Sequence, residues 1–521
     1  MDLRQKAILQ MEQNQGRVGK SMADDKQPDA TGGTAVDELQ KVIDDSSKGL
    51  LDKVLDYGEL NNESQKTFAT DAIQNFASEV SNQKIKIQKD IYRAIDARIA
   101  EIDATLTAQI NEILHNTEFQ KLEGSWRAIY DMVEHSEPDD QLKIKILDVK
   151  KKDLLADFES ASDFDQSGLF ELMYEKEYGT FGGEPYGMMI ADYEFSRGVT
   201  DIACLKGLSQ VASAAHAPCL SAASPELFNM KDFTELNKPK SLEALFSSAE
   251  FGAWANFRKT EEARYISLTM PRVIGRQVYG GQDGLPVETF HFQENMQNKD
   301  GSSNYLWSNS SYKLAQRIVT SYRESGWFST IRGAENGGTV EGLPIHNYTD
   351  ENGDKTFKMP VETVITDRRE KELADLGFNA LVYKRGTDTA TFFESKVIHL
   401  PEEFEEADAN TNAQINIVLP YIMALSRFAH YLKVIMRDKV GSFATKESIS
   451  SYLNNWIRRF VILDDNPSAL TAAQFPLREA RVDVVDNPGK PGSYSAVIYL
   501  RPHYYFNDIK VSMRLVSQLP G

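Results

Sequence analysis

A long helical repeat between residues 65 and 115 is the strongest constraint on how this chain can fold. Apolar residues recur there mostly at steps of three, four or seven, which is the spacing of one stripe along an α-helix or a coiled coil. The stripe contains Phe68, Ala72, Phe76, Val80, Ile87, Ile91, Ile95, Ile99, Ile102, Leu106, Ile110 and Ile113. An unbroken helix of this length would extend about 75 Å, which is more than the width of a compact domain. The sequence therefore predicts that this helix packs partly against another chain.

The remainder of the chain predicts a mixed α/β fold with three further regions. Residues 1–35 form a polar leader, and residues 36–135 form a helical region that contains the long repeat. We expect an α/β core domain over residues 136–375 and a C-terminal domain with strands over residues 376–521.

Short patterns inside these regions predict individual elements. Residues 143–149 alternate between polar and apolar side chains, which predicts a β-strand, and a helix is expected over 151–158. Residues 186–192, 198–215 and 217–222 then predict a strand, a helix and a strand in βαβ order.

The C-terminal region has its own pattern. We expect helices over residues 413–437 and 447–461, followed by alternating runs at 480–485, 494–501 and 509–516. A Pro- and Gly-rich turn joins the first two runs as a hairpin.

Charge and composition narrow the class of protein. The 521 residues carry a formal net charge of −19, so a phosphate-rich partner would be repelled over most of the surface. Two cysteines cannot build a disulfide framework, which favours a reducing compartment. No stretch of about 18 apolar residues occurs, so we expect no membrane insertion. These features predict a cytosolic protein with no nucleic-acid partner.

Three motifs with chemical potential are incomplete. Residues 16–21 resemble a phosphate-binding loop, but the first glycine of that motif is missing and no strand precedes it. Residues 350–361 begin like a calcium loop, but Lys355 replaces the required glycine and Val361 replaces the bidentate glutamate. Cys204, His216 and Cys219 lack the spacing of a zinc site and are expected in the core. We therefore predict no catalytic residue, no metal and no cofactor.

One helix carries a candidate binding strip. Lys433 and Arg437 lie four residues apart on the predicted 413–437 helix, so they share one face. The strip could meet an acidic partner, or it could be an ordinary solvated face, and the pattern does not separate the two interpretations.

Four segments resemble one known family. Residues 118–127, Glu-Phe-Gln-Lys-Leu-Glu-Gly-Ser-Trp-Arg, resemble a signature of the large sheath subunit of type VI secretion systems, the VipB/TssC family. Residues 183–195 resemble that family's apolar strand ending in Asp-Tyr-Glu-Phe, and residues 426–443 resemble its long C-terminal helix. The tail over residues 488–516 is similar as well. Ala128 is a departure, because the family usually has glycine there.

The resemblance implies a structural subunit of the bacterial cytoplasm rather than an enzyme. Members of the family pair with a small VipA/TssB-like subunit, and the pairs stack with further copies into a helical cylinder on a baseplate. The cylinder surrounds a tube of Hcp-like rings, and its contraction drives the tube and spike outward. A ClpV-like AAA+ unfoldase then dismantles the contracted sheath.

The resemblance also implies roles for particular residues. The unfoldase-recognition helix would contain Leu50, Leu51, Val54 and Leu55. The surface that packs on the small subunit would contain Ile91, Ile95, Ile99, Ile102 and Leu106. The strands that link neighbouring subunits would contain Val482, Val484, Val497 and Tyr499.

Two alternatives remain open at this point. The chain could be the sheath protein of another contractile, phage-tail-like device. It could also be a hydrolase with a scattered site, in which case His430 and Asp192 are the candidate residues.

Overall fold

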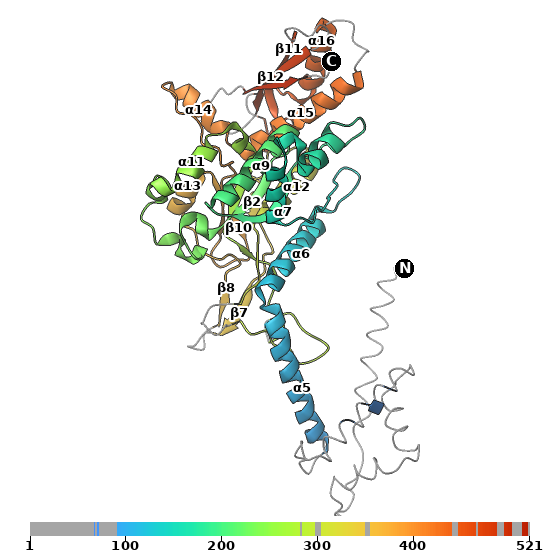
Figure 1. Ribbon diagram of the computed structural model, residues 1–521, viewed down its shortest axis with the longest axis vertical. Helices are drawn as coiled ribbons and strands as arrows, with labels where there is room; N and C mark the ends of the chain where they lie inside the picture. The colour runs from blue at the N-terminus through green and yellow to red at the C-terminus, as the bar shows by residue number, and fades with distance from the viewer. Residues whose placement is uncertain are drawn as a thin grey trace, which may run out of the picture. The chain divides into compact units, whose positions relative to one another are not determined.

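The computed structural model describes residues 67, 70, 71, 75, 91–281, 284–296, 304–349, 355–439, 446–464, 467–486, 494–502 and 513–518. The chain divides into two compact units, Met1–Leu106 and Thr107–Gly521. All the strands that the structure describes lie in the second unit (Figure 1).

Helices and strands alternate along the described part of the chain. The α-helices are α5 (Ile91–Leu114), α6 (Thr117–Ser136), α7 (Lys151–Ser160), α8 (Gly168–Phe170), α9 (Val199–Ala215), α10 (Leu242–Phe246), α11 (Gly252–Arg258), α12 (Ser311–Ser325), α13 (Asp367–Asp375), α14 (Ala407–Ile415), α15 (Leu419–Lys439), α16 (Lys446–Ile457) and α17 (Ala469–Gln474). The short 3₁₀ and π segments are η1 (Phe164–Gln166), η2 (Glu171–Tyr178), η3 (Pro225–Phe228), η4 (Phe233–Asn237), η5 (Ala249–Phe251), η6 (Glu261–Tyr265) and η7 (Arg458–Phe460). The strands are β1 (Met189–Phe195), β2 (Cys219–Ala223), β3 (Ile266–Met270), β4 (Val273–Ile274), β5 (Trp307–Ser308), β6 (Thr339–Val340), β7 (His346–Thr349), β8 (Lys355–Lys358), β9 (Phe378–Tyr383), β10 (Ala390–Phe392), β11 (Leu477–Asp486), β12 (Tyr494–Pro502) and β13 (Met513–Gln518).

A six-stranded sheet in the order β1-β2-β3-β9-β10-β6 organises the second unit. The first four strands are parallel, and β10 and β6 extend the sheet in antiparallel pairing. Strands β2, β3 and β9 are buried along their whole length, as expected for parallel strands covered on both faces.

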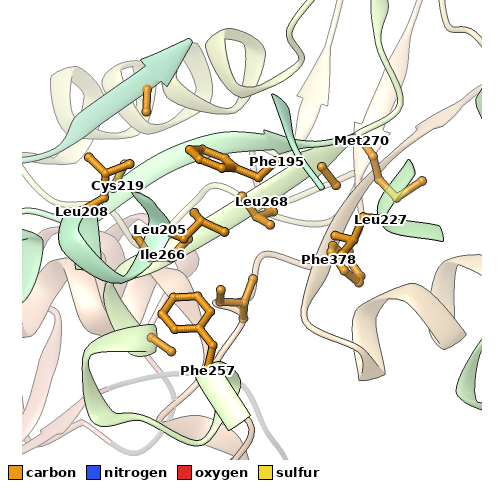
Figure 2. Packing of buried hydrophobic residues seen from close by; sticks show 14 of the residues in the cluster. Phe195, Leu205, Leu208, Cys219, Leu227, Phe257, Ile266, Leu268, Met270 and Phe378 are labelled. Atoms are coloured by element: carbon orange, nitrogen blue, oxygen red, sulfur yellow. The ribbon is translucent and has the colours of Figure 1, made fainter. Parts of the chain in front are cut away.

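Alternate residues of β9 enter different cores, because successive side chains of a strand point to opposite faces. On β9, Phe378 and Ala380 enter the core built around α9, whereas Leu381 and Tyr383 enter the core that contains α12. Figure 2 shows the first of these cores, where Leu205 and Leu208 of α9 lie among side chains from β1, β2, β3 and β9. Helix α7 packs closely on α9 at a small residue: a Cβ atom on Gly207 of α9 would lie 2.3 Å from the ring of Phe158 on α7.

The C-terminal part has a separate antiparallel sheet in the order β11-β12-β13. Val482 and Val484 of β11 and Ile498 of β12 pack with α15 and α16 in a third core. Figure 1 shows α15, α16, β11 and β12 gathered in this part of the chain.

Most element predictions are confirmed. Strand β1, helix α9 and strand β2 form the expected βαβ unit, and β11 and β12 form the expected hairpin. The prediction of a strand over residues 143–149 is wrong: the segment belongs to no strand of the described chain, although its sequence alternates.

Two expected boundaries differ from the structure. The boundary at residue 375 would divide the six-stranded sheet, because β9 and β10 lie beyond it and pair with β3 and β6. The boundary at residue 135 would assign α6 to the helical region, whereas α6 packs on α12 and β5 of the second unit. Long-range strand pairing caused the first difference and long-range helix packing caused the second, and local composition reveals neither.

Gly124 is the tightest point of the α6 packing and provides a test. A Cβ atom there would lie 2.9 Å from the main-chain oxygen of Trp307 on β5, which has little freedom to move. We expect Gly124→Ala to lower the free energy of unfolding by about 1–3 kcal/mol through overpacking. The control is Gly252→Ala at the start of α11, where nothing lies within 4 Å, and stability should be unchanged or slightly higher. Denaturant unfolding of both variants measures the difference, and equal stabilities would contradict the close packing.

Candidate partner-binding surfaces

Helix α5 presents an apolar stripe that the described chain does not cover. Ile95, Ile99, Ile102 and Leu106 are between 39% and 48% exposed, although they recur at the spacing of one helix face. Ile91 is the first residue of the same helix. The expected small-subunit residues therefore share one helix, and the stripe is available to a partner.

Helix α6 has one buried face and one exposed apolar face. The exposed face was not predicted as a binding surface from the sequence. Asn116 caps the helix, since its side chain accepts hydrogen bonds from the N–H groups of Glu118 and Phe119. The buried face contains Gly124, Ala128, Met132 and Ser136 at steps of four.

The other face of α6 is exposed and carries Phe119, Leu122, Trp126 and Tyr130. Trp126 is 56% exposed and Tyr130 is 68% exposed. We call these four residues the α6 stripe. Their spacing of three and four residues was the available signal, and three of the four lie within residues 118–127, which predicted only the family resemblance. Large aromatic side chains exposed in a row are characteristic of interaction surfaces.

A buried ion cluster fixes α6 to the loop after β4. The guanidinium of Arg276 donates to Glu123 of α6 (Nε to Oε1, 2.7 Å) and to both carboxylate oxygens of Glu294 (2.7 and 2.9 Å). Arg127 also donates to Glu123, at 2.7 Å. Burial alone would raise the pKa of Glu294, but the hydrogen bonds from Arg276 and from the N–H of Tyr279 lower it overall. Two signature residues, Glu123 and Arg127, therefore hold the helix in position rather than face a ligand.

The structure corrects the interpretation of Lys433 and Arg437. Lys433 Nζ donates to the hydroxyl of Tyr174 at 2.8 Å and lies 3.7 Å from the ring centroid of Tyr178. Arg437 donates to the main-chain oxygen of Tyr178 at 3.1 Å. Both side chains are half-buried against η2 of the same chain, so they form neither a strip open to an acidic partner nor a solvated face. A cation over an aromatic ring is favourable, and sequence spacing on one helix cannot reveal which rings will cover it.

The expected linking strands are part of the C-terminal sheet. Val482, Val484 and Val497 are buried and Tyr499 is half-buried. Asn454 of α16 covers the outer edge of β11, because its side-chain amide donates to the oxygen of Val482 at 2.7 Å and accepts from its N–H at 3.0 Å. Strand β13 pairs with β12 on one side and is the end strand of this sheet within the described residues.

Other candidates fall partly outside the described chain. Leu50, Leu51, Val54 and Leu55 lie outside the described residues, as do residues 16–21 and residues 350–354, the first part of the calcium-like stretch.

The residues considered for catalysis and zinc binding are core residues. Burial lowers the pKa of His216 to about 4 and that of His430 to about 3, so both rings are neutral. Burial also raises the pKa of Cys204 to about 11 and that of Cys219 to about 12. Asp192 is on β1 and its pKa is raised by burial. Among the described residues, no three His, Cys, Asp or Glu side chains are grouped to hold a metal ion.

A search of the described helices for membrane spans found no helix that is both long and apolar enough to cross a bilayer.

Two family models match the chain in sequence. The first, described as the EvpB/VC_A0108 tail sheath N-terminal domain (VipB), matches residues 96–399. The second, described as the EvpB/VC_A0108 tail sheath gpW/gp25-like domain, matches residues 408–519. Their junction falls after β10, so the whole six-stranded sheet lies within the first match.

Known proteins are similar to the chain at two levels. The type VI secretion system sheath protein TssC1 of Pseudomonas aeruginosa is 43% identical over 454 residues, which cover 86% of this chain and 91% of that protein. Among solved structures, the anti-feeding prophage baseplate and contracted helical sheath each align with 61% of this chain, and with 66% and 63% of their own chains, at 10% identity. Their TM-scores of 0.30 and 0.26 are too low to support an argument from structure.

Arg276 provides a test of the ion cluster. We expect Arg276→Met to lower the free energy of unfolding by about 3–5 kcal/mol, because two carboxylates would lose their buried cation. The side chain is only 5% exposed. The control is Arg323→Met: Arg323 is 35% exposed and pairs with Glu137 and Asp139 at the surface, so about 0–1 kcal/mol is expected. Thermal and denaturant unfolding would distinguish the variants, and a small loss for Arg276→Met would show that the cluster contributes little.

Proposed function

The chain belongs to the VipB family of type VI secretion sheath proteins, and from this membership we propose how its surfaces serve the assembled sheath. It is the large subunit of a contractile sheath. The observation that carries this conclusion is the identity of 43% over 86% of the chain, together with two sheath-domain models matched in order. In the proposed assembly, the chain and a small VipA/TssB-like subunit form a helical cylinder whose contraction propels an inner tube and spike.

The small subunit packs on helix α5 in this proposal. The exposed stripe of Ile95, Ile99, Ile102 and Leu106 supports it, because a row of large apolar side chains in water is unfavourable until another apolar surface covers it. The α6 stripe has the same character and is proposed as a second contact with a neighbouring subunit.

Neighbouring copies join through the C-terminal sheet. A strand added to a sheet edge gains main-chain hydrogen bonds, and these can persist while subunits rotate relative to one another. The geometry supports β13 as the joining edge, because Asn454 already occupies the main-chain groups of Val482 on β11. Each bond contributes a net ~1 kcal/mol, which becomes large when many subunits repeat it.

The remaining partners follow from the same assignment. We propose that the chain performs no catalysis and requires no cofactor, and that the assembled lattice stores the energy of contraction. The baseplate and an Hcp-like inner tube are its other proposed contacts, and a ClpV-like unfoldase would recognise the segment around Leu51 in the bacterial cytoplasm. Because each copy has a formal charge of −19, close assembly requires local contacts that offset the repulsion between copies.

The role of α5 is tested by placing charge on its stripe. The double variant Ile99→Asp/Ile102→Asp should no longer copurify with the small sheath subunit of the same system, because two carboxylates would be buried without partners. Ala104→Asp is the matched control, since Ala104 is exposed on the opposite side of the helix. Affinity copurification and electron microscopy of the coexpressed proteins provide the measurement. Hollow tubes are expected with the wild type and the control, and tubes formed by the double variant would remove α5 from the interface.

The linking role of β13 is tested by truncation. Removal of residues 513–521 leaves β11 and β12 with their contacts to α15 and α16, so the C-terminal core should remain folded. We expect pairs with the small subunit that remain soluble and do not polymerise. Analytical ultracentrifugation and electron microscopy measure the two states, with circular dichroism as the folding control. Long tubes of the truncated protein would refute a linking role for this strand.

A further inference from the structure

Residues 143–149, Lys-Ile-Lys-Ile-Leu-Asp-Val, have the sequence of a β-strand but pair with no strand of the described chain. Among the described residues, no main-chain hydrogen bond joins the N–H or C=O groups of residues 143–148 to another main-chain group. Ile146 is 58% exposed and Leu147 is 53% exposed. The segment therefore presents unpaired main-chain groups and two large apolar side chains to water, which is the description of an uncovered strand edge.

Contacts at both ends hold the segment in place. At the start, Asp139 accepts hydrogen bonds from the N–H groups of Gln141 and Leu142. At the end, Lys151 donates to Asp201 at 2.7 Å and to the main-chain oxygen of Glu194 on β1 at 2.8 Å. The middle has side-chain ion pairs, such as Lys143 with Glu184, but no main-chain pairing. These hydrogen bonds and ion pairs at both ends distinguish the segment from an unrestrained loop.

Side chains, rather than the main chain, connect the segment to the sheet. The hydroxyl of Tyr193 on β1 donates to the oxygen of Val149 at 2.6 Å, and Lys151 reaches the oxygen of Glu194. Strand β1 is itself an end strand of the six-stranded sheet. An unpaired β-like segment therefore lies beside an unpaired strand edge.

The segment is locally basic in an acidic chain. Residues 143–152 contain five lysines and one aspartate, and three of the lysines pair within the chain, namely Lys143 with Glu184, Lys145 with Glu177 and Lys151 with Asp201. Lys150 and Lys152 are exposed, and neither has an ion pair among the described residues. The partner that fits this surface is an extended strand in which acidic side chains accompany apolar ones.

We propose that a strand of the small sheath subunit, acidic and partly apolar, pairs with residues 143–149. The inference rests on the proposed function, since that function supplies the partner. A second copy of this chain is a poorer occupant through the same segment, because two basic segments would repel each other. An edge with two exposed apolar side chains is also an aggregation hazard, so a partner that is permanently present suits it better than a transient one.

Hydrogen–deuterium exchange of the full chain, alone and in complex with the purified small sheath subunit, tests the pairing. The amides of residues 143–148 should exchange rapidly in the free chain, since no main-chain acceptor bonds them among the described residues. In the complex, alternate amides of this segment should slow by roughly tenfold or more. Unchanged exchange in a complex that does form would overturn the inference and leave the proposed function intact. No complex at all would overturn the proposed function.

Proline scanning supplies a second measurement. Ile146→Pro and Leu147→Pro each remove an N–H group that has no acceptor in the described chain, so the free protein should melt as the wild type does. At least one of the two should bind the small subunit roughly five- to tenfold more weakly. The control is Glu403→Pro, which removes an exposed N–H group without a main-chain acceptor in another loop. Equal binding by all three variants would contradict strand pairing.

Charge reversal tests the identity of the occupant. Lys150→Glu/Lys152→Glu should weaken binding of the small subunit about tenfold at low salt and less at high salt. Both changes lie at the start of α7, where acidic side chains are compatible with the helix. The matched control is Lys206→Glu/Lys259→Glu, which makes the same charge change at exposed positions elsewhere. Protection of residues 143–148 that arises on self-association without the small subunit would assign the surface to a second copy and refute the proposal.

Discussion

The rest of the structure is organised around three parallel strands, β2, β3 and β9, that are buried on both faces. Strand β1 pairs with β2 at the end of this sheet, and the side chains of β1, β2 and β9 alternate between the core around α9 and the core that contains α12. A sheet of this kind requires helices on each side. Helix α12 packs on this sheet, and α6 packs in turn on α12 and β5. Gly124 and the Glu123–Arg276 contact determine which face of α6 is buried there, so the α6 stripe on the opposite face is exposed.

The surfaces left uncovered have one physical character. The stripe on α5, the α6 stripe and residues 143–149 each have the pattern of a buried element, yet their large apolar side chains are exposed in the described chain. Monomeric soluble proteins rarely expose this many large apolar side chains in contiguous patches. The contacts with neighbouring sheath subunits that we propose would cover all three surfaces.

Sequence patterns predicted elements well where a local period was sufficient. The βαβ unit of β1, α9 and β2 and the hairpin of β11 and β12 follow from periodicity and turn residues. The prediction of a β-strand over residues 143–149 was wrong for a physical reason. Their sequence alternates as in a strand, but a strand also needs a paired neighbour, and the described chain does not supply one. The domain boundary at 375 failed because β9 returns to a sheet that begins almost two hundred residues earlier.

The sequence by itself determined the family, the periodic elements and the stripe on α5, since each depends on residue identity at short spacing. Which charged side chains form contacts within the chain depends on the tertiary structure. Lys433 and Arg437 had the spacing of a binding strip, but η2 places Tyr174 and Tyr178 over them. Glu123 and Arg127 looked like part of a signature, and the fold places them around a buried Arg276 from the loop after β4. The physical reason is the same in each case: a charge or an apolar face acquires its role from the groups packed against it, and those groups come from distant parts of the chain.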